Sequence, residues 1–336
     1  MVLSLDDFLK LRVNLPVVDV RSEGEHAQGH IPRAQNIPLL NNEERVQVGT
    51  DYKQKGQQAA IKTGFRLVGP RLINIIEETE LVGKELLVHC WRGGMRSNNF
   101  SQFVGMAGIK SHTLSGGYKA YRQRAMEAFR QPFQFRIIGG YTGSGKSDVL
   151  RALQQLGAQV IDLEALANHK GSAFGGLTLP PQPTTEQFQN ELFEAILQLD
   201  ARKPIFIEDE SIAIGKIFLP ADFWHTMTQS PVIQLVVQKD VRVTRLTAEY
   251  GVADRTAFLE AMGNIVKRLG GQHYQAAREK LLAGDMESTI DILLTYYDKA
   301  YARGLEKKKD RVKYRFSWEG IDLNTFAKHI LTEVNG

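Results

Sequence analysis

The sequence predicts an α/β protein with two α/β domains in series, followed by a helical, basic extension at the C-terminal end. Two observations predict this class. Short apolar runs typical of strands alternate with longer helix-like segments, and this alternation occurs twice along the chain. Each alternation also contains a glycine-rich loop directly after an apolar run. A chain of 336 residues with 43% hydrophobic and 24% charged residues is long enough to build two domains.

The first domain is predicted over residues 1–130. Apolar runs that enter polar turns indicate its strands, and the segments between them have helical character. The predicted strands are 17–20, 86–89 and 112–114, and the predicted helices are 69–80, 97–105 and the basic segment 118–130. A linker is expected at residues 131–134.

The core of the second domain is predicted over residues 131–240, and residues 241–336 are expected to be mainly helical and to pack with it. The predicted strands are 135–139, 159–162, 205–208 and 232–237, with helices at 146–156 and 185–199. Residues 171–183 include six glycines or prolines and are predicted to form a loop or lid.

The overall composition narrows the setting of the protein. No apolar stretch approaches the ~20 residues needed to span a bilayer, so no membrane contact is expected. The acidic N-terminus lacks signal-peptide features, and a single cysteine cannot form an intrachain disulfide, so we expect a cytoplasmic protein. The net charge is +4, and basic residues cluster late in the chain. This cluster consists of Lys307, Lys308, Lys309, Arg311, Lys313 and Arg315. It is either a solvated surface or a contact surface for nucleic-acid phosphates.

The first glycine-rich loop follows a predicted strand and contains the chain's one cysteine, Cys90. The loop's N–H groups and the start of the next helix would point toward the sulfur, lower its pKa and bind an anion delivered to it. Gly93 and Gly94 allow a close backbone approach, and Arg92 and Arg96 can supply positive charge. We therefore predict a catalytic site formed by Cys90, Arg92 and Arg96.

The second glycine-rich loop has the pattern Gly-x4-Gly-Lys-Ser and lies between a predicted strand and a predicted helix, which is the setting of a P-loop. Its backbone N–H groups would hold a diphosphate, Lys146 would reach the distal phosphate, and Ser147 could bind Mg²⁺. The predicted phosphate-binding residues of this loop are Gly140, Gly143, Ser144, Gly145, Lys146 and Ser147.

Charged residues elsewhere complete the predicted phosphate site. The apolar strand at 205–208 ends in carboxylates, and Asp209 is the first choice for the metal side of the site, ahead of Glu208 and Glu210. Polar residues at the carboxyl ends of other strands face the same crevice, which adds the stretches 162–164 and 169–175 as candidates. Arg242 and Arg245 resemble the lid arginines of small P-loop kinases; these two and Asp209 are predicted to bind the diphosphate, and Ser147 and Asp209 to bind Mg²⁺ where it is used.

Residues 1–125 resemble the rhodanese family. The matching motifs are Asp19-Val20-Arg21, Gly29-His30-Ile31-Pro32 and Leu114-Ser115-Gly116-Gly117-Tyr118. Cys90 sits where rhodaneses carry sulfur as a persulfide, but Arg96 lies six residues after Cys90, one more than is usual in that family. This spacing also fits Cys-dependent phosphatases of rhodanese fold, and the wider ring suits a tetrahedral anion such as phosphate or selenophosphate.

A rhodanese-like α/β domain fused in this order to a P-loop NTPase-like α/β domain resembles the family of tRNA 2-selenouridine synthases. The matching stretches are 90–97, 140–147, 162–164 with 169–172, and 208–211. The resemblance implies a transferase that alkylates 2-thiouridine at the wobble position of tRNA with geranyl diphosphate and then replaces the S-geranyl group with selenium from selenophosphate. It leaves two roles for Cys90, carrying selenium as a perselenide or assisting departure of geranyl thiol.

The resemblance also implies partners and cofactors. The expected macromolecular substrate is tRNA with 2-thiouridine at the wobble position, and a synthetase that supplies selenophosphate is a candidate partner. No firmly bound cofactor is expected, and Mg²⁺ is optional. Three other functions remain open from the residues alone: a P-loop kinase or NTPase with a regulatory rhodanese module, a binding module in which the rhodanese domain only recruits a partner, and the phosphatase described above.

Overall fold

The computed structural model describes residues 1–335 and divides the chain into two compact units, Met1–Ala128 and the remainder from Phe129. The division follows the end of helix α7 (Gly117–Ala128). No division falls at residue 240, because a strand from the C-terminal part joins the sheet of the second unit. The predicted helical extension is therefore part of the same unit as the P-loop.

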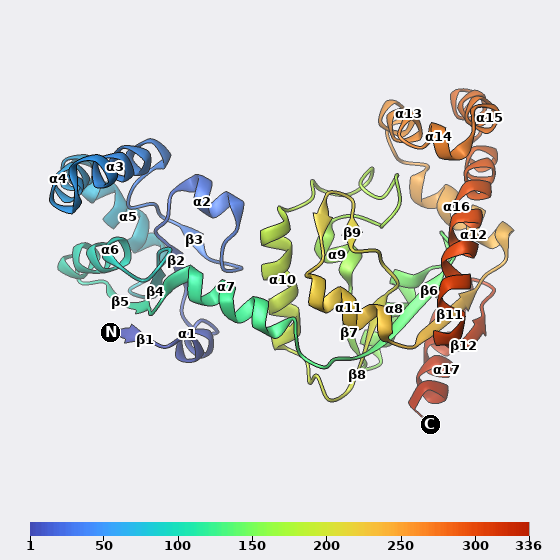
Figure 1. Cartoon of the computed structure of the whole chain (residues 1–336), viewed down its shortest axis with the longest axis horizontal. Helices are drawn as coiled ribbons and strands as arrows, with labels where there is room; N and C mark the ends of the chain where they lie inside the picture. Colours follow the sequence, from blue (N-terminus) through green and yellow to red (C-terminus); the bar gives the residue numbers. More distant parts are fainter. Residues whose placement is uncertain (336) are drawn as a thin grey trace. The chain divides into compact units, whose positions relative to one another are not determined.

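The first unit is an α/β layer of short parallel strands and connecting helices (Figure 1). Its strands are β1 (Val2–Leu3), β2 (Val17–Asp19), β3 (Gln35–Asn36), β4 (Glu85–His89) and β5 (Lys110–Leu114). Its helices are α1 (Leu5–Leu11), α2 (Glu23–Gln28), α3 (Asn42–Lys55), α4 (Gln57–Val68), the 3-10 turn η1 (Gly69–Arg71), α5 (Leu72–Val82), α6 (Met95–Met106) and α7.

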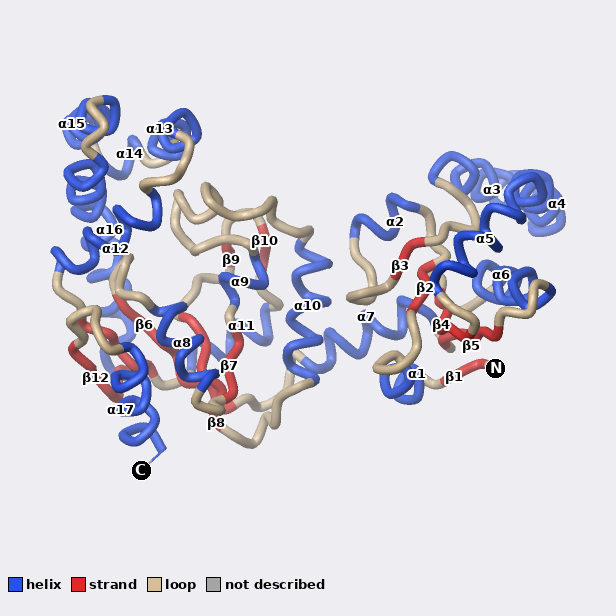
Figure 2. Tube along the Cα trace, turned by 180° about the vertical axis from the view of Figure 1, so that it is seen from behind, coloured by secondary structure: helices blue, strands red, loops and turns tan. Residues whose placement is uncertain are grey.

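The sheet of the first unit has the order β1-β5-β4-β2-β3, and all its pairs are parallel. The central strand β4 is covered on both faces, so Leu86, Leu87 and Val88 are fully buried, as a continuous apolar run predicts. Cys90 directly follows this strand. Helices α3 and α4, which the sequence analysis did not distinguish, lie side by side in Figures 1 and 2. Asn41 begins α3 through a capping box with Glu44.

The second unit contains a second parallel sheet and more helices. Its strands are β6 (Gln134–Gly140), β7 (Gln159–Ile161), β8 (Pro204–Glu208), β9 (Ala213–Ile214), β10 (Ile217–Phe218), β11 (Val232–Val236) and β12 (Val312–Ser317). Its helices are α8 (Lys146–Gln155), α9 (Leu163–Ala167), α10 (Thr185–Leu197), α11 (Ala221–Gln229), α12 (Lys239–Tyr250), α13 (Arg255–Gly263), α14 (Val266–Leu269), α15 (Gly271–Leu282), α16 (Met286–Lys308), the 3-10 turn η2 (Lys309–Arg311) and α17 (Leu323–Asn335).

The order of the second sheet is β12-β11-β6-β8-β7, with every pair parallel. The P-loop strand β6 is central, as β4 is in the first unit. Ligands of open parallel sheets bind beyond the carboxyl ends of the strands, and both glycine-rich loops lie at such ends. Strand β12 was not predicted, since its Lys313 and Arg315 were read only as part of a basic run.

The long helix α16 connects the helical region to the sheet region of the second unit, and Figure 2 shows it from behind. One apolar core fills the space between the sheet and helices α8 and α17. A second core joins α12, α13, α15 and α16 and includes Phe174 from the glycine- and proline-rich loop. Residues 171–183 hold no helix or strand, which confirms the predicted loop, although Phe174 is buried. Within residues 1–335, no helix combines the length and apolar character needed to cross a membrane.

Candidate functional site

The P-loop of the second unit connects β6 directly to the first turn of α8. Gly145 has a φ of 76° and precedes Lys146, the first residue of the helix. A Cβ atom on Gly145 would lie 2.7 Å from the Trp318 ring, so only glycine fits this left-handed, crowded position. The Ser144 hydroxyl is buried and has no hydrogen-bond partner in the described part of the chain. The loop therefore has the strand–turn–helix form that cradles phosphates.

A cavity of about 450 Å³ lies over this loop and is lined by several elements of the second unit. Every predicted P-loop residue, Gly140 through Ser147 as named above, belongs to its lining. The other lining residues come from the strand ends, from the loop after α9, from α12 and from α16; those with charged or aromatic side chains are Asp148, Arg151, Glu164, Lys170, Asp209, Glu210, Arg245, Glu249, Tyr250, Tyr297, Tyr301 and Lys308. The volume is that of a small-molecule site.

Lys146 is a partly buried cation of the cavity. Burial alone would lower its pKa, but the negative charges of Glu164, Glu210 and Asp209 outweigh burial and hold the pKa above its ordinary value. Ser147 donates a hydrogen bond of 2.7 Å to Glu164, so Glu164 is the carboxylate that contacts the P-loop hydroxyl. Asp209, the preferred candidate from the sequence, also lines the cavity.

The three carboxylates after β8 have different surroundings. Asp209 forms an ion pair of 2.5 Å with Lys308 at the end of α16. Glu208 is buried and accepts a hydrogen bond of 2.9 Å from the backbone N–H of Leu163, and its burial beside Asp162 raises its pKa well above the usual value. Glu208 is absent from the cavity lining. Burial also raises the pKa of Glu210 to about 8.

The two predicted lid arginines of α12 separate in the structure. Arg245 lines the cavity, pairs with Asp148 and lies over the Trp318 ring. Arg242 is buried outside the lining, and both of its terminal nitrogens contact Asp298 at 2.8 Å. It also donates to the Thr142 carbonyl of the P-loop at 3.2 Å. Arg242 thus contacts the P-loop backbone and lies outside the cavity lining, while its buried Nε has no hydrogen-bond partner among residues 1–335. A contact of Arg242 with a diphosphate stays a prediction.

The cavity carries oxygen donors suited to Mg²⁺. Glu164 and Asp209 stand beside the P-loop, where they would repel a diphosphate unless a cation lay between them. Among residues 1–335, no three acidic, histidine or cysteine side chains converge to hold a metal by themselves. That arrangement fits Mg²⁺, which is usually held by one or two carboxylates together with substrate phosphates. Ser147 and either carboxylate would supply the protein oxygens.

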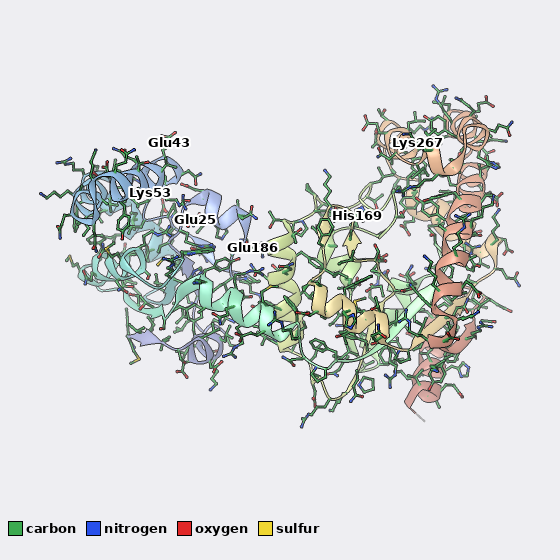
Figure 3. All side chains as sticks on the ribbon, viewed as in Figure 1. Glu25, Glu43, Lys53, His169, Glu186 and Lys267 are labelled. Atoms are coloured by element: carbon green, nitrogen blue, oxygen red, sulfur yellow. The ribbon has the colours of Figure 1, made fainter. Side chains whose placement is uncertain are left out.

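The loop after α9 forms one rim of the cavity. Lys170, Gly171 and Ser172 line it, and Lys170 pairs with Glu249 of α12 at 2.8 Å. His169, labelled in Figure 3, begins this segment and donates its backbone N–H to the Glu164 carbonyl at 3.0 Å. The loop thus continues directly from α9, the helix that carries Glu164.

In the first unit, the thiol loop is closed by the Gly116-Gly117 motif. Gly117 has a φ of 60°, and a Cβ atom there would lie 2.3 Å from the Cys90 carbonyl and 2.5 Å from the Gly93 nitrogen. The backbone approaches the loop too closely for any side chain. This contact explains physically why the two motifs, distant in the sequence, occur together.

Cys90 is buried, with its Sγ 3.3 Å from the Ser97 hydroxyl. Burial raises the pKa of the thiol, but hydrogen bonds from the Ser97 hydroxyl and from the backbone N–H groups of Ser97, Gly94 and Arg92 outweigh it, and the pKa is lowered. This arrangement agrees with the expected ring of donors around a thiolate. The sequence analysis did not name Ser97 as a functional residue. Its position in the first turn of the helix that follows the cysteine could have indicated it, because side chains there lie close to the loop.

The two predicted arginines of this loop contribute differently. Arg96 donates two hydrogen bonds to Glu25 of α2, at 2.6 and 3.2 Å, and Glu25 is labelled in Figure 3. Arg96 therefore forms an ion pair with the Glu25 carboxylate, which fixes the position of its guanidinium group. The Arg92 side chain is exposed, while its backbone N–H contributes to the ring around Cys90.

A buried polar cluster supports the strand end beneath the thiol. Arg21 donates to Asp19 at 2.6 Å and to the Gly29 carbonyl at 2.7 Å, and it lies 3.9 Å from the centre of the Tyr118 ring. Burial lowers the pKa of His89 to about 4, so this histidine is neutral at physiological pH. Through Arg21, the cluster around Asp19 thus connects the end of β2 to Tyr118, which follows the Gly116-Gly117 motif.

The late basic run does not form one uniform surface. Lys308 lines the phosphate cavity, and Arg311 donates to the Met227 and Ser230 carbonyls. Lys307 and Lys309 are exposed. Of the residues at the end of α16, only the exposed Lys307 and Lys309 therefore remain candidates for a nucleic-acid surface.

Two family models match this chain. The model described as tRNA 2-selenouridine synthase AAA domain matches residues 133–330, and the model described as Rhodanese-like domain matches residues 4–124. These matches confirm the predicted fold class.

Three relatives with the name tRNA 2-selenouridine synthase align along nearly the whole chain. The protein from Marinobacter nauticus is 36% identical, covering 92% of this chain and 94% of its own. The protein from Hydrogenovibrio crunogenus is 36% identical, with coverage of 96% and 98%. The protein from a Shewanella species is 34% identical, with coverage of 91% and 93%.

Proposed function

This chain belongs to the tRNA 2-selenouridine synthase family and is a tRNA-modifying transferase, and we propose that it converts wobble 2-thiouridine to 2-selenouridine in two exchanges. Geranyl diphosphate is the alkyl donor of the first exchange, and selenophosphate is the selenium donor of the second. The proposal rests on one observation above all: each unit has its own anion-binding loop, and only one of the two loops carries a thiol.

In the first exchange, the 2-thio sulfur bonds to C1 of the geranyl group. The C1–O bond breaks, diphosphate leaves with the bonding electron pair, and the uridine loses its N3 proton. The P-loop cavity suits the diphosphate because Lys146, Arg245 and Lys308 line it as cations. Mg²⁺ held by Ser147 and a carboxylate would neutralise further charge on the leaving group.

In the second exchange, Cys90 assists departure of geranyl thiol: its thiolate sulfur bonds to C2 of the base as the C2–S bond to the geranyl sulfur breaks, and that sulfur leaves with the bonding electrons and takes up a proton. Selenium of selenophosphate then bonds to C2, and the bond from C2 to the Cys90 sulfur breaks, which restores the thiolate. Water then cleaves the Se–P bond and releases phosphate. Alkylation makes the sulfur a better leaving group. We assign the Cys90 loop to this exchange, because its N–H groups and low thiol pKa suit an anionic reactant and a nucleophile.

Mass spectrometry of tRNA nucleosides tests this proposal directly. Purified protein is incubated with thiolated tRNA and geranyl diphosphate, with or without selenophosphate. We expect S-geranyl-2-thiouridine with the diphosphate alone and 2-selenouridine when both reagents are present. Nucleotide hydrolysis without any change of the nucleoside would favour the kinase or NTPase function instead. Release of phosphate from a phosphomonoester, again with unchanged nucleosides, would favour the phosphatase.

A further inference from the structure

The first unit contains an apolar pocket that none of the steps above uses. Its volume is about 120 Å³, and it lies among α3, α4, α6 and the segment before α3. Apart from Arg96 and Asn99, its lining is apolar or aromatic, and consists of Leu39, Leu40, Val48, Tyr52, Ala60, Ile61, Gly64, Phe65, Val68, Met95 and Phe103. A cavity of ~150 Å³ with such a lining binds a hydrocarbon the size of benzene. The pocket thus has room for a hydrocarbon unit of about five carbons.

Large apolar side chains remain exposed around this pocket. Tyr52, Phe65 and Met95 are each at least half exposed, at 54%, 57% and 50%. Helix α3 buries none of its residues, although Val48 and Tyr52 point their apolar surface to the pocket lining. Exposed apolar surface gathered around a cavity is typical of a binding site for an apolar group.

The pocket is tied to the thiol through the start of α6. Met95 and Arg96 line the pocket and are the first two residues of that helix. Arg96 is held in place by Glu25. Burial lowers the pKa of Arg96, but the negative charges of Glu25 and Cys90 outweigh it, so this guanidinium lies within electrostatic reach of the thiol. Arg96 therefore belongs both to the pocket wall and to the surroundings of Cys90, whereas Ser97, which hydrogen-bonds to the sulfur, lies on the other face of the helix from Met95.

We propose that this pocket binds the prenyl chain of the S-alkylated nucleoside during the selenium exchange. This inference rests on the proposed function. Among the reactants of that function, selenophosphate, diphosphate and the tRNA backbone are anions, and the prenyl chain alone is a hydrocarbon. A pocket beside the thiol would hold the alkylated base with its C2–S bond near Cys90. It would also let the second exchange distinguish an alkylated base from plain 2-thiouridine.

The test compares binding and conversion of two anticodon stem-loop RNAs, one with S-geranyl-2-thiouridine and one with S-methyl-2-thiouridine. Because each buried CH₂ group contributes measurably to affinity, we expect the full-length protein to bind the geranyl RNA at least ~10-fold more tightly. Gly64→Phe should remove this preference. Gly64 lines the pocket, and a Cβ atom there meets no neighbour within 4 Å, so the new ring can enter the pocket.

Gly49→Phe is the matched control. Gly49 lies on α3, outside the pocket lining, and its Cβ position is equally open. This variant should keep the wild-type preference. Val48→Gln is a second pocket variant. Val48 is only partly buried, at the edge of the core of the first unit, so the fold of this variant is checked by its thermal unfolding. Val48→Gln should lower binding of the geranyl RNA and leave the methyl RNA unchanged.

Two results would overturn the pocket assignment. One is equal binding of the two RNAs by wild-type protein, and the other is an undiminished preference in folded Gly64→Phe and Val48→Gln. Failure of the proposed function looks different: wild-type protein would bind the geranyl RNA preferentially but form no 2-selenouridine with selenophosphate. A lost preference in the pocket variants would then still support the pocket as a prenyl site.

Discussion

Lys308 Nζ lies 2.5 Å from Asp209 Oδ1, although 99 residues separate them in the chain. This ion pair brings the end of α16 to the carboxyl end of β8, and both side chains line the P-loop cavity. The ion pair fixes the position of the Lys308 ammonium group at the cavity. In the sequence this lysine is part of a basic run that could be a solvated surface or a nucleic-acid surface, and the structure places it in the cavity lining.

Lys308→Gln should weaken use of geranyl diphosphate. Loss of a charge-assisted contact to a phosphate is expected to raise the KM for this substrate by ~10-fold or more. The measurement is the initial rate of S-geranylation at varied geranyl diphosphate concentration. Lys280→Gln is the control, because Lys280 is exposed on α15, pairs with Asp285 and lies outside the cavity lining. An equal effect of both changes would place Lys308 outside the site.

Lys146→Ala should abolish prenyl transfer. Lys146 is the cation of the P-loop, and removal of a group that stabilises developing charge lowers rates by ~10²–10³-fold. Neither S-geranyl nucleoside nor, downstream, 2-selenouridine should form from thiolated tRNA. Supplying tRNA that already carries the S-geranyl group should restore selenation. Near-normal geranylation by the mutant would remove the diphosphate from the P-loop.

Diphosphate binding should weaken as the pH rises through about 8. Burial raises the pKa of Glu210 to about 8, the positive charge of Lys146 opposes this shift, and Glu164 adds to it. Below that pH the Glu210 carboxyl is protonated and neutral, and above it a negative charge appears beside the ligand. Titration of inorganic pyrophosphate between pH 7 and pH 9 measures the effect. Glu210→Gln should bind with a flatter pH profile, and because the ligand is the same, its own titration cancels in the comparison.

The two glycine-rich loops could be predicted because their signals are local. An apolar strand, a turn of glycines and a helix start occupy consecutive residues, so Cys90 and Lys146 could be assigned without knowledge of the packing. Glu164 was only one candidate among several carboxylates at strand ends. The 2.7 Å contact with Ser147 selects it, and that contact depends on how β7 and α8 pack.

Other parts of the site depend on long-range packing. Arg242 and Arg245 lie three residues apart on α12, yet one pairs with Asp298 of α16 and the other lines the cavity. The two arginines have different surroundings because α16 covers one side of α12. The local sequence does not indicate which side that is. Strand β12 likewise pairs with β11 across a long helical segment, so its pattern alone did not identify it.

The exposed lysines at the end of α16 should bind tRNA through its phosphates. Charge reversal at Lys307 and Lys309 should weaken tRNA binding and flatten the dependence of log affinity on log salt. A double reversal at Lys53 and Lys62, both exposed in the first unit, changes the net charge equally and serves as the control. The measurement is tRNA affinity across a salt titration. If both double variants behave alike, the effect is one of net charge and this stretch is an ordinary solvated surface.

Cys90→Ser should separate the two exchanges. Serine keeps the size of the side chain, but its far higher pKa leaves no anionic nucleophile at neutral pH. The P-loop belongs to the other unit, so geranylation should continue at the wild-type rate. We expect S-geranyl-2-thiouridine to accumulate and 2-selenouridine to fall by ~10²-fold or more, as measured by nucleoside mass spectrometry.

Ser97→Ala is the graded companion to that variant, because it keeps the thiol and removes the hydroxyl that hydrogen-bonds to it. Loss of this donor should raise the pKa of the Cys90 thiol, because the Ser97 hydroxyl hydrogen-bonds to the charged form of the sulfur. The rate of selenation at neutral pH should then fall and recover as the pH is raised, and thiol alkylation should follow the same profile.

Full selenation by Cys90→Ser would show that selenophosphate reacts without the thiol. Loss of both exchanges in folded Cys90→Ser would instead mean that the thiol also serves alkylation.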